Sequence, residues 1–365
     1  MTRKFPGAAR SVLALPMVAA ALIAGCGSND SAAEDDQPDT GLTSVKSYLT
    51  EHTAELVTQT DALKTAADSY YDLARANDFN YAAMLRKECE AVNSALTDAK
   101  NAFVKANPAY EEMEGIVAGI PRTAQYDTDI DAGSDASDPA SAVSFNLTLP
   151  NGEVMKQPGN LFFLIETSLY GTNEDLVVNG VKPDVNCDGK VSFGEGLPDA
   201  DIFKASANEI SRQARDLDQD AQEIVITPSD AFTAITVMTP TMSEYFEQWK
   251  LSSFVAGEGK AGEEGFVATS RLSDIADILT GIDFTYEEIE PLIAEKNADQ
   301  AEQTAVELSN LLGTAEDLRD REAAGERFTA RQADQLGAEM QARAERIAGQ
   351  VAQAAKDLDI EIQEG

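Results

Sequence analysis

The stretch "ADQLGAEMQARAERIAGQVAQAAKDL", residues 333–358, carries apolar side chains at steps of three and four residues. Side chains at this spacing lie on one face of an α-helix, and a period near 3.5 residues is typical of helices packed lengthwise against one another. The stripe consists of Ala333, Leu336, Met340, Ala344, Ile347, Val351, Ala354 and Leu358. Because it is narrow and rich in alanine, it predicts a long helix in a closely packed antiparallel bundle.

Further stripes of the same kind lie on both sides of the chain's midpoint. One runs from Val45 to Ala74, another from Ala301 to Leu318, and a third covers residues 81–106. We expect the third helix to end at Asn107-Pro108, because proline disfavours helical geometry in the residue before it. The pattern therefore predicts helices at 43–122 and again at 205–365.

The residues between these helical regions, 123–204, have a different pattern. Apolar side chains alternate with polar ones from Val143 to Leu149, and Asn151-Gly152 follows. Asn-Gly supplies the positive φ angles of a tight turn, so a β-hairpin is predicted here. An acidic loop precedes the hairpin and a short helix follows it. We interpret 123–204 as a connector between two helical parts.

The charge of the chain is strongly negative. Its 365 residues hold 64 acidic and 28 basic side chains, a formal net charge of −36. Such a surface repels nucleic acid and anionic lipid and attracts cations. Nucleic acid is therefore excluded as a partner. Cation binding and an acidic surface that only confers solubility are both consistent with the negative charge.

The N-terminus has the three parts of an export signal. Basic residues including Arg3 and Arg10 precede or border an apolar run, residues 11–23, which is too short for a permanent membrane span. The run ends in "LIAGC", which resembles a bacterial lipobox with Cys26 as the lipidated residue. We predict a lipoprotein signal peptide at 1–25 and a flexible acidic tether at 26–42; an ordinary secretory peptide is the alternative. The protein is expected in the cell envelope, lipid-anchored on the outer face of the cytoplasmic membrane or in the periplasm.

Two cysteines remain if Cys26 carries lipid. A leftover pair in an oxidising compartment favours a disulfide between Cys89 and Cys187. Two independent thiols are the alternative.

The segment "DVNCDGKVSFGE", residues 184–195, has the ligand order of a calcium loop. Oxygen donors stand at positions one, three, five, nine and twelve, a glycine stands at six, and position seven offers its backbone carbonyl. These calcium ligands are Asp184, Asn186, Asp188, Lys190, Ser192 and Glu195. Pro183 and the following glycines do not favour flanking helices, so we expect a structural calcium clip rather than a sensor. A weaker version at 127–138 has alanine at the glycine position and is either a second cation loop or a solvated acidic loop.

Several stretches resemble the imelysin-like family, which includes EfeO-type lipoproteins of iron uptake. The resemblance covers most of the chain and is clearest at 107–133 ("NPAYEEMEGIVAGIPRTAQYDTDIDAG") and 147–171 ("LTLPNGEVMKQPGNLFFLIETSLYG"), and weaker at 270–318. It implies an all-α fold of two antiparallel four-helix bundles. It also implies export and a role in acquiring iron or another metal; some members are classed as peptidases.

The family's metal signature, as the resemblance implies, is a helical Gly-x-His-x-x-Glu. In the aligned stretch, 161–166, leucine replaces the glycine and Phe163 replaces the histidine, while Glu166 is retained. Glu166 is then either a remaining ligand or a hydrogen-bonded core acid. The chain's single histidine, His52, stands three residues before Glu55, so a relocated iron site of His52, Glu55 and Glu166 is one hypothesis and an interior histidine is the other.

The leading functional hypothesis is a lipoprotein that binds iron (Fe²⁺ or Fe³⁺) or a related cation for uptake, with Ca²⁺ as a structural ion. Its expected partners are the cation, the membrane through the lipid anchor, and a permease or a surface partner. The rival is a calcium-stabilised surface interaction protein that has lost the family's metal site. A peptidase is third, and we do not expect an enzyme, because no catalytic histidine, serine or phosphate-binding motif is present.

Overall fold

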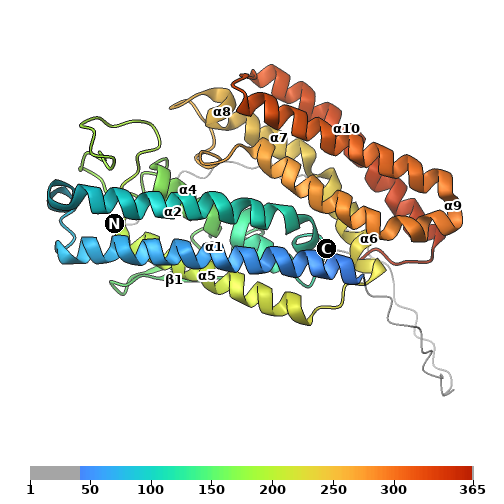
Figure 1. Cartoon of the computed structure of the whole chain (residues 1–365), viewed down its shortest axis with the longest axis horizontal. Helices are drawn as coiled ribbons and strands as arrows, with labels where there is room; N and C mark the ends of the chain where they lie inside the picture. Colours follow the sequence, from blue (N-terminus) through green and yellow to red (C-terminus); the bar gives the residue numbers. More distant parts are fainter. Residues whose placement is uncertain (1–41, 364–365) are drawn as a thin grey trace, which may run out of the picture. The chain divides into compact units, whose positions relative to one another are not determined.

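The apolar stripes of the sequence become the buried faces of long helices. A computed structural model describes residues 42–363, so the predicted signal peptide, Cys26 and nearly all of the predicted tether lie outside the described residues. Most of the described residues are helical, and their one named sheet is a small two-stranded hairpin, which confirms the predicted all-α fold (Figure 1). None of the described helices is long and apolar enough to cross a membrane.

The first hydrophobic core is enclosed by four helices and the connector. These helices are α1 (Thr43–Ala76), α2 (Tyr81–Val117), α4 (Leu161–Tyr170) and α5 (Ala200–Glu223). The connector also contains the short helix α3 (Ala124–Asp127), the π-helical segment η1 (Thr128–Ala132), and strands β1 (Asn146–Thr148) and β2 (Val154–Lys156). The strands pair antiparallel, which confirms the predicted hairpin; residues 149–153 join them, and of Asn151 and Gly152 only Gly152 has a positive φ, +90°.

The second hydrophobic core lies in the C-terminal half of the chain. Its elements are α6 (Pro228–Met238), η2 (Thr239–Thr241), α7 (Met242–Leu251), α8 (Ser253–Ala256), α9 (Arg271–Ala323) and α10 (Ala330–Asp357). Helix α9 is interrupted by non-helical backbone at Asn297. In α10, six of the eight stripe residues are buried, and Leu336 and Leu358 are partly buried against the same core.

Helix α5 corrects the expected boundary at residue 205. Its apolar face, which includes Phe203, Ile210 and Leu217, is buried in the first core rather than the second. The same face of α5 also contacts α1, because the hydroxyl of Ser211 donates a hydrogen bond to a carboxylate oxygen of Asp61 at 2.8 Å. The C-terminal helical part therefore begins at α6.

Helix α2 corrects the expected stop at Pro108. The helix continues through this proline to Val117. Proline removes one helical hydrogen bond and costs about 3 kcal/mol inside a helix. The neighbouring Ala106, Ala109 and Tyr110 are all buried, and their packing offsets this cost. The extension carries α2 into contact with α9.

The contact between α2 and α9 joins the two cores through small residues. A methyl group at Gly281 of α9 would lie 2.0 Å from the carbonyl oxygen of Glu112 on α2. A methyl at Gly115 would lie 2.9 Å from Ile282. The two backbones therefore touch, and the C-terminal part of α2 is fixed against the start of α9. The acidic site described next lies at this junction.

Candidate functional site

Two carboxylates project from the extension of α2 into the junction between the cores. Glu111 and Glu114 are three residues apart, so they share one face of the helix. Glu111 is 0% exposed and Glu114 is 3% exposed. Glutamates are seldom fully buried unless they are paired or bind a cation, so their position needs a physical explanation.

A third carboxylate reaches the same point from the π-helical segment η1. One oxygen each of Glu111, Glu114 and Asp131 lie within 4.8 Å of one another. The neighbouring Asp129 points elsewhere, because Ser144 donates to it through both its backbone N–H and its hydroxyl. The acidic loop at 127–138 is thus not a loop of alternating ligands: it sends Asp131 toward α2 and uses Asp129 as a buried brace.

The start of α9 adds a cation to the site. The guanidinium of Arg271 lies 3.1 Å from a carboxylate oxygen of Asp274, 3.6 Å from Glu111 and 3.9 Å from Asp131. It is sandwiched between the rings of Tyr245 and Phe266, with its central carbon 4.3 and 4.8 Å from the ring centres. Burial opposes its charge, but the surrounding carboxylates raise the pKa of Arg271 well above its usual value. It therefore stays charged.

Each of the two glutamates has one oxygen that accepts a hydrogen bond and one that accepts none, although Oε2 of Glu111 lies 3.6 Å from the guanidinium of Arg271. Asn107 donates to Oε1 of Glu111 at 3.0 Å, and Tyr245 donates to Oε1 of Glu114 at 2.9 Å. No amide, hydroxyl or cationic group of the described residues donates a hydrogen bond to either Oε2, although both Oε2 atoms are buried. This arrangement is typical of metal ligands, whose outer contacts fix the carboxylate while the inner oxygen faces the ion.

The carboxyls hold protons unusually strongly. Burial, followed by the charge of Asp131, raises the pKa of Glu114 to about 7, and burial followed by the charge of Asp274 raises the pKa of Glu111 well above its usual value. Burial also raises the pKa of Asp274 to about 6, against the opposing effect of Arg271. Without a further cation, full ionisation of this group is therefore costly at neutral pH. A bound metal ion would supply the missing positive charge.

The carboxylate of Glu166 lies in a different set of contacts. It accepts hydrogen bonds from the backbone N–H groups of residues 266–268 at 2.7, 2.8 and 2.8 Å. Burial raises its pKa to about 7 even though these three donors oppose the shift. Of the two alternatives, a remaining metal ligand and a hydrogen-bonded core acid, Glu166 is the second. Its hydrogen bonds fasten the loop that leads into Arg271. Phe163, at the position where the resemblance implies a histidine, offers no metal ligand.

His52 and Glu55 are not brought to Glu166. The Nε2 atom of His52 lies 2.5 Å from a carboxylate oxygen of Glu112, on the side of α2 that faces α1. Glu55 is exposed and accepts from Gln59 at 2.6 Å. The hypothesis of an iron site made from His52, Glu55 and Glu166 is corrected, because each of the three has its own separate surroundings.

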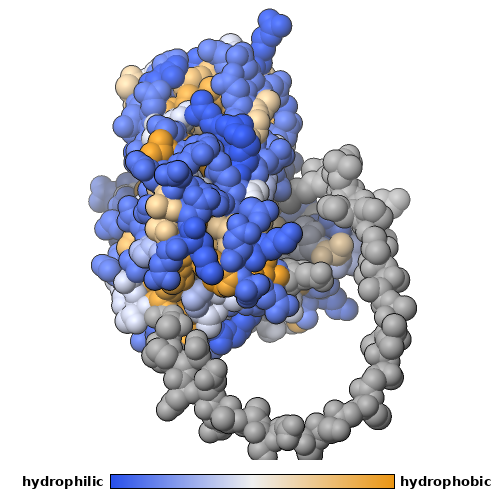
Figure 2. Space-filling view, turned by 90° about the vertical axis from the view of Figure 1, so that its right-hand side faces the viewer, coloured by the Kyte–Doolittle hydropathy of each residue, from blue (hydrophilic) through white to orange (hydrophobic). Residues whose placement is uncertain are grey.

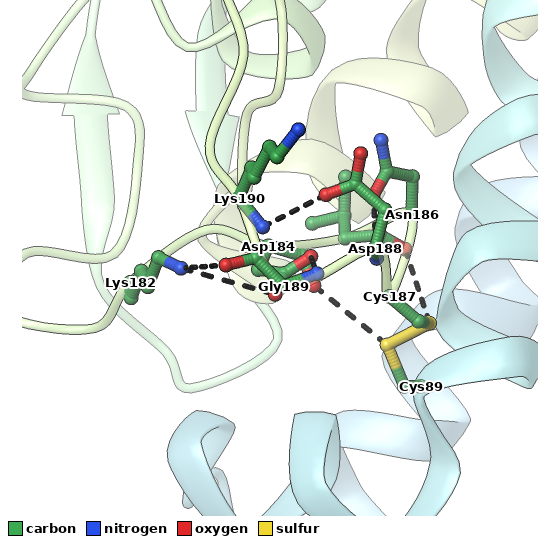
Figure 3. Close-up of a disulfide and its surroundings, with 9 residues drawn as sticks. Cys89, Lys182, Asp184, Asn186, Cys187, Asp188, Gly189 and Lys190 are labelled. Carbon is green, nitrogen blue, oxygen red and sulfur yellow. Dashed lines mark hydrogen bonds and ion pairs between the residues drawn. A yellow bond between two sulfur atoms is a disulfide. The ribbon is translucent and has the colours of Figure 1, made fainter.

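The segment 184–195 forms an exposed loop next to α2 (Figure 3). Asp184 accepts from the N–H of Gly189, Asn186 from that of Asp188, and Asp188 from that of Lys190. Gly189 has φ +85°, as the sharp turn at position six requires. The side-chain oxygens that were predicted to bind calcium thus accept hydrogen bonds from the loop's own backbone.

The far end of the loop is tied to the first core. Glu195 accepts from the N–H of Ser192 at 2.8 Å, while its other oxygen is buried without a hydrogen-bond partner among the described residues. Cys187 forms a disulfide with Cys89 of α2, with a Cα–Cα distance of 6.1 Å, as the cysteine count favours. Lys100 of α2 also donates to the carbonyl of Gly194 at 2.8 Å.

The acidic site of Glu111, Glu114 and Asp131 was not among the sites predicted from the sequence, for identifiable reasons. A helix expected to end at Asn107-Pro108 does not place Glu111 and Glu114 on the same continuous buried face as the residues before the proline. In a chain with 64 acidic residues, a Glu-x-x-Glu spacing is also common. The usable signal was that both glutamates fall among apolar residues of α2, which a helix continued through Pro108 would have revealed.

Comparison with known proteins places the chain in a family. The sequence pattern of the imelysin family, which carries a peptidase label, matches residues 41–355. No curated protein matches the sequence. The chain is similar to a solved structure, a protein assigned as an iron-regulated protein A precursor from Parabacteroides distasonis ATCC 8503, with 14% identity and a TM-score of 0.44 over 89% of this chain and 97% of that one. Since the family match spans most of the sequence, this chain belongs to the imelysin family.

Proposed function

We propose that the protein binds a metal cation, iron or a related ion, at Glu111, Glu114 and Asp131, and serves its uptake as an envelope lipoprotein. The observation that carries this proposal is that Oε2 of Glu111 and Oε2 of Glu114 are buried and accept no hydrogen bond from an amide, hydroxyl or cationic group of the described residues; the nearest cation, Arg271, lies 3.6 Å from Oε2 of Glu111. A buried unsatisfied polar atom costs about 1–3 kcal/mol, and more when it is charged. A cation among the three carboxylates would remove that cost.

The setting of the site supports cargo binding rather than surface adsorption. The ligand oxygens come from α2 and η1 of the first core, and the counter-charge Arg271 comes from α9 of the second. Asp131, with 12% of its side chain exposed, is more accessible than the two glutamates. An ion bound here would therefore be held by ligands of the first core, next to the start of α9, and be shielded from water.

The surface and the N-terminus support the proposed location. Hydrophilic residues predominate on the face shown in Figure 2, and the exposed large apolar side chains are scattered over several elements. The net charge of −36 attracts cations to such a surface. The export signal and Cys26 of the sequence support a lipid-anchored protein of the cell envelope.

Calorimetric titration of the protein without its signal peptide tests this function. We expect one iron ion to bind per chain, and Glu111→Gln to abolish that binding because it replaces an ionised ligand with an amide. The matched control is Glu90→Gln, which removes an exposed acid from the same helix. Unchanged binding in Glu111→Gln would refute the proposed site.

We further propose that segment 184–195 binds a structural calcium ion. The segment has the full set of calcium-ligand types, and one carboxylate oxygen of Glu195 is buried without a hydrogen-bond partner among the described residues. Because the disulfide links the loop to α2, a calcium ion that stabilised the loop would also stabilise its attachment to that helix. Extracellular calcium modules have dissociation constants of order 10⁻⁴ to 10⁻³ M. Millimolar Ca²⁺ should raise the melting temperature of the protein, and Asp184→Ala should remove that rise; an equal rise in both proteins would contradict the proposal.

Two other functions make different predictions. A calcium-stabilised interaction protein would bind Ca²⁺ but no iron, whether or not Glu111 is intact. A peptidase, as the family label suggests, would cleave an unfolded protein substrate at a rate that depends on the acidic site. Both outcomes can be read from the same protein preparations.

A further inference from the structure

The acidic site is covered on one side by a segment without regular structure. Residues 257–270 lie between α8 and α9 and contain no helix or strand. The ring of Phe266 in this segment lies over the guanidinium of Arg271, with 4.8 Å between the ring centre and the central guanidinium carbon. Phe266 is partly exposed, whereas Arg271 is 3% exposed and lies 3.6 Å from Oε2 of Glu111. On this side the ring therefore separates the solvent from the site.

Side chains of the first core hold this segment in place. Glu166 of α4 accepts hydrogen bonds from the backbone N–H groups of residues 266–268. The hydroxyl of Thr172, just after α4, donates to the carbonyl oxygen of Glu264 at 2.6 Å. Three of these four hydrogen bonds share one carboxylate as their acceptor. The attachment of the segment therefore depends mainly on a single residue, Glu166.

The backbone of the segment combines a strained residue with two glycines in open space. Phe266 has φ +54°, a conformation that bulky side chains rarely adopt and that persists where surrounding contacts hold it. Gly257 and Gly259 have φ +90° and +70°, and a methyl group at either would meet nothing within 4 Å. The other face of Arg271 is covered by Tyr245, a buried residue of helix α7. The segment is therefore the part of the cover that can open without unwinding a helix.

We propose that segment 257–270 is a gate through which the ion enters and leaves the acidic site, and that Glu166 holds this gate closed. The inference rests on the proposed cation site and adds the route of the ion. Glu111 and Glu114 are buried, so an ion reaches them only after part of their surroundings has moved. Glu166 is a positioning residue, because it holds the segment and not the ion.

A gate of this kind has a definite kinetic signature. None of the three proposed ligands, Glu111, Glu114 and Asp131, belongs to the segment. Opening the segment more often therefore raises the rates of binding and release by the same factor and leaves the affinity nearly unchanged, since affinity shifts only through contacts that differ between the two states.

Iron exchange and amide hydrogen exchange together test the gate. Under nitrogen, the chelator ferrozine colours with Fe²⁺ and reports the rate of release from the loaded protein. Quenching a fresh mixture of protein and Fe²⁺ with ferrozine at short times reports the rate of uptake, and calorimetry gives the affinity. Excess Ca²⁺ keeps segment 184–195 filled. Hydrogen exchange of residues 266–268 in the metal-free protein measures the opening of the segment itself.

Two variants weaken the attachment to different degrees. Glu166→Gln replaces the charged acceptor of three hydrogen bonds, so both rate constants should rise at least tenfold, hydrogen exchange should rise by the same factor, and the affinity should stay within about threefold. Thr172→Val removes one hydrogen bond and should raise both rate constants about threefold. The control is Thr65→Val, an exposed threonine of α1 whose hydroxyl donates within its own helix.

The outcomes distinguish the gate from the proposed function. Rate constants of Glu166→Gln within about twofold of wild type would refute the gate and leave the proposed function intact. Faster release with an equal loss of affinity would also refute the gate, since Glu166 would then stabilise the bound ion. If Glu166→Gln does not fold, Thr172→Val decides by the same criteria. If Glu111→Gln binds iron as the wild type does, both the proposed site and the gate are refuted.

Discussion

Replacing Glu114 by glutamine should make the metal-free protein more stable at pH 8 and leave its stability at pH 5 nearly unchanged. In the folded protein the pKa of Glu114 rises from 4.5 to about 7, chiefly through burial. Because the folded-state pKa is the higher one, the protonated carboxyl favours folding below pH 4.5. That contribution is lost as the pH rises through 7. Glutamine never ionises, so it avoids this loss.

The size of the effect follows from the shift. One pKa unit corresponds to about 1.4 kcal/mol, so a rise from 4.5 to about 7 amounts to roughly 3 kcal/mol at pH 8. The hydrogen bond from Tyr245 can pass to the amide oxygen of glutamine, so little of this gain is lost. For a chain of this length, 1 kcal/mol corresponds to about 1.5 °C in melting temperature. The expected rise is therefore roughly 4 °C.

Thermal melts followed by circular dichroism at pH 5 and pH 8, in the presence of a chelator, measure this difference. Glu90→Gln, an exposed acid on α2, is the control and should change neither value by more than a degree. If Glu114→Gln melts at or below the wild-type temperature at pH 8, the reasoning that buried carboxyls are held at a cost for a cation is refuted.

Three other expectations concern the frame around the site. Cys89→Ser opens a disulfide whose cysteines are 98 residues apart and should cost about 4–5 kcal/mol in urea unfolding; identical midpoints for the oxidised wild type and the variant would contradict this. Gly281→Ala should destabilise by more than 2 kcal/mol, since its methyl would meet a carbonyl oxygen of α2 at 2.0 Å. Gly313→Ala on the same helix, with nothing within 4 Å, should stabilise by about 0.5–1 kcal/mol, and a loss in both would point to helix α9 itself rather than to the contact. Glu166→Gln leaves backbone donors of residues 266–268 without a charged acceptor, so limited proteolysis should cut the preceding loop faster, and an unchanged rate would show that the carboxylate does not fasten it.

The fold could be predicted from the sequence to a large extent. The stripe at 333–358 marked α10 because its period matches a helix packed on one face, and the alternation before Asn151-Gly152 marked the hairpin. Both signals are local, so they survive without knowledge of the rest of the structure. The assignment of α5 failed because its stripe shows that one face is buried but not which neighbour buries it.

The site was harder to predict because it depends on contacts between distant residues. A local rule ends a helix at Asn107-Pro108, yet tertiary packing carries α2 past it. Asp131 and Arg271 are 140 residues apart in the chain and meet only because α2 and α9 touch. Single-sequence periodicity holds no information on such a meeting.

Anomalous diffraction from crystals of the iron-loaded protein tests the central claim most directly. Data collected on both sides of the iron absorption edge, with calcium present to fill segment 184–195, locate the ion without assumptions about its ligands. We expect one iron peak per chain, within about 2–2.5 Å of oxygens from Glu111, Glu114 and Asp131. An iron peak beside His52 or Glu166, or iron confined to segment 184–195, would contradict it.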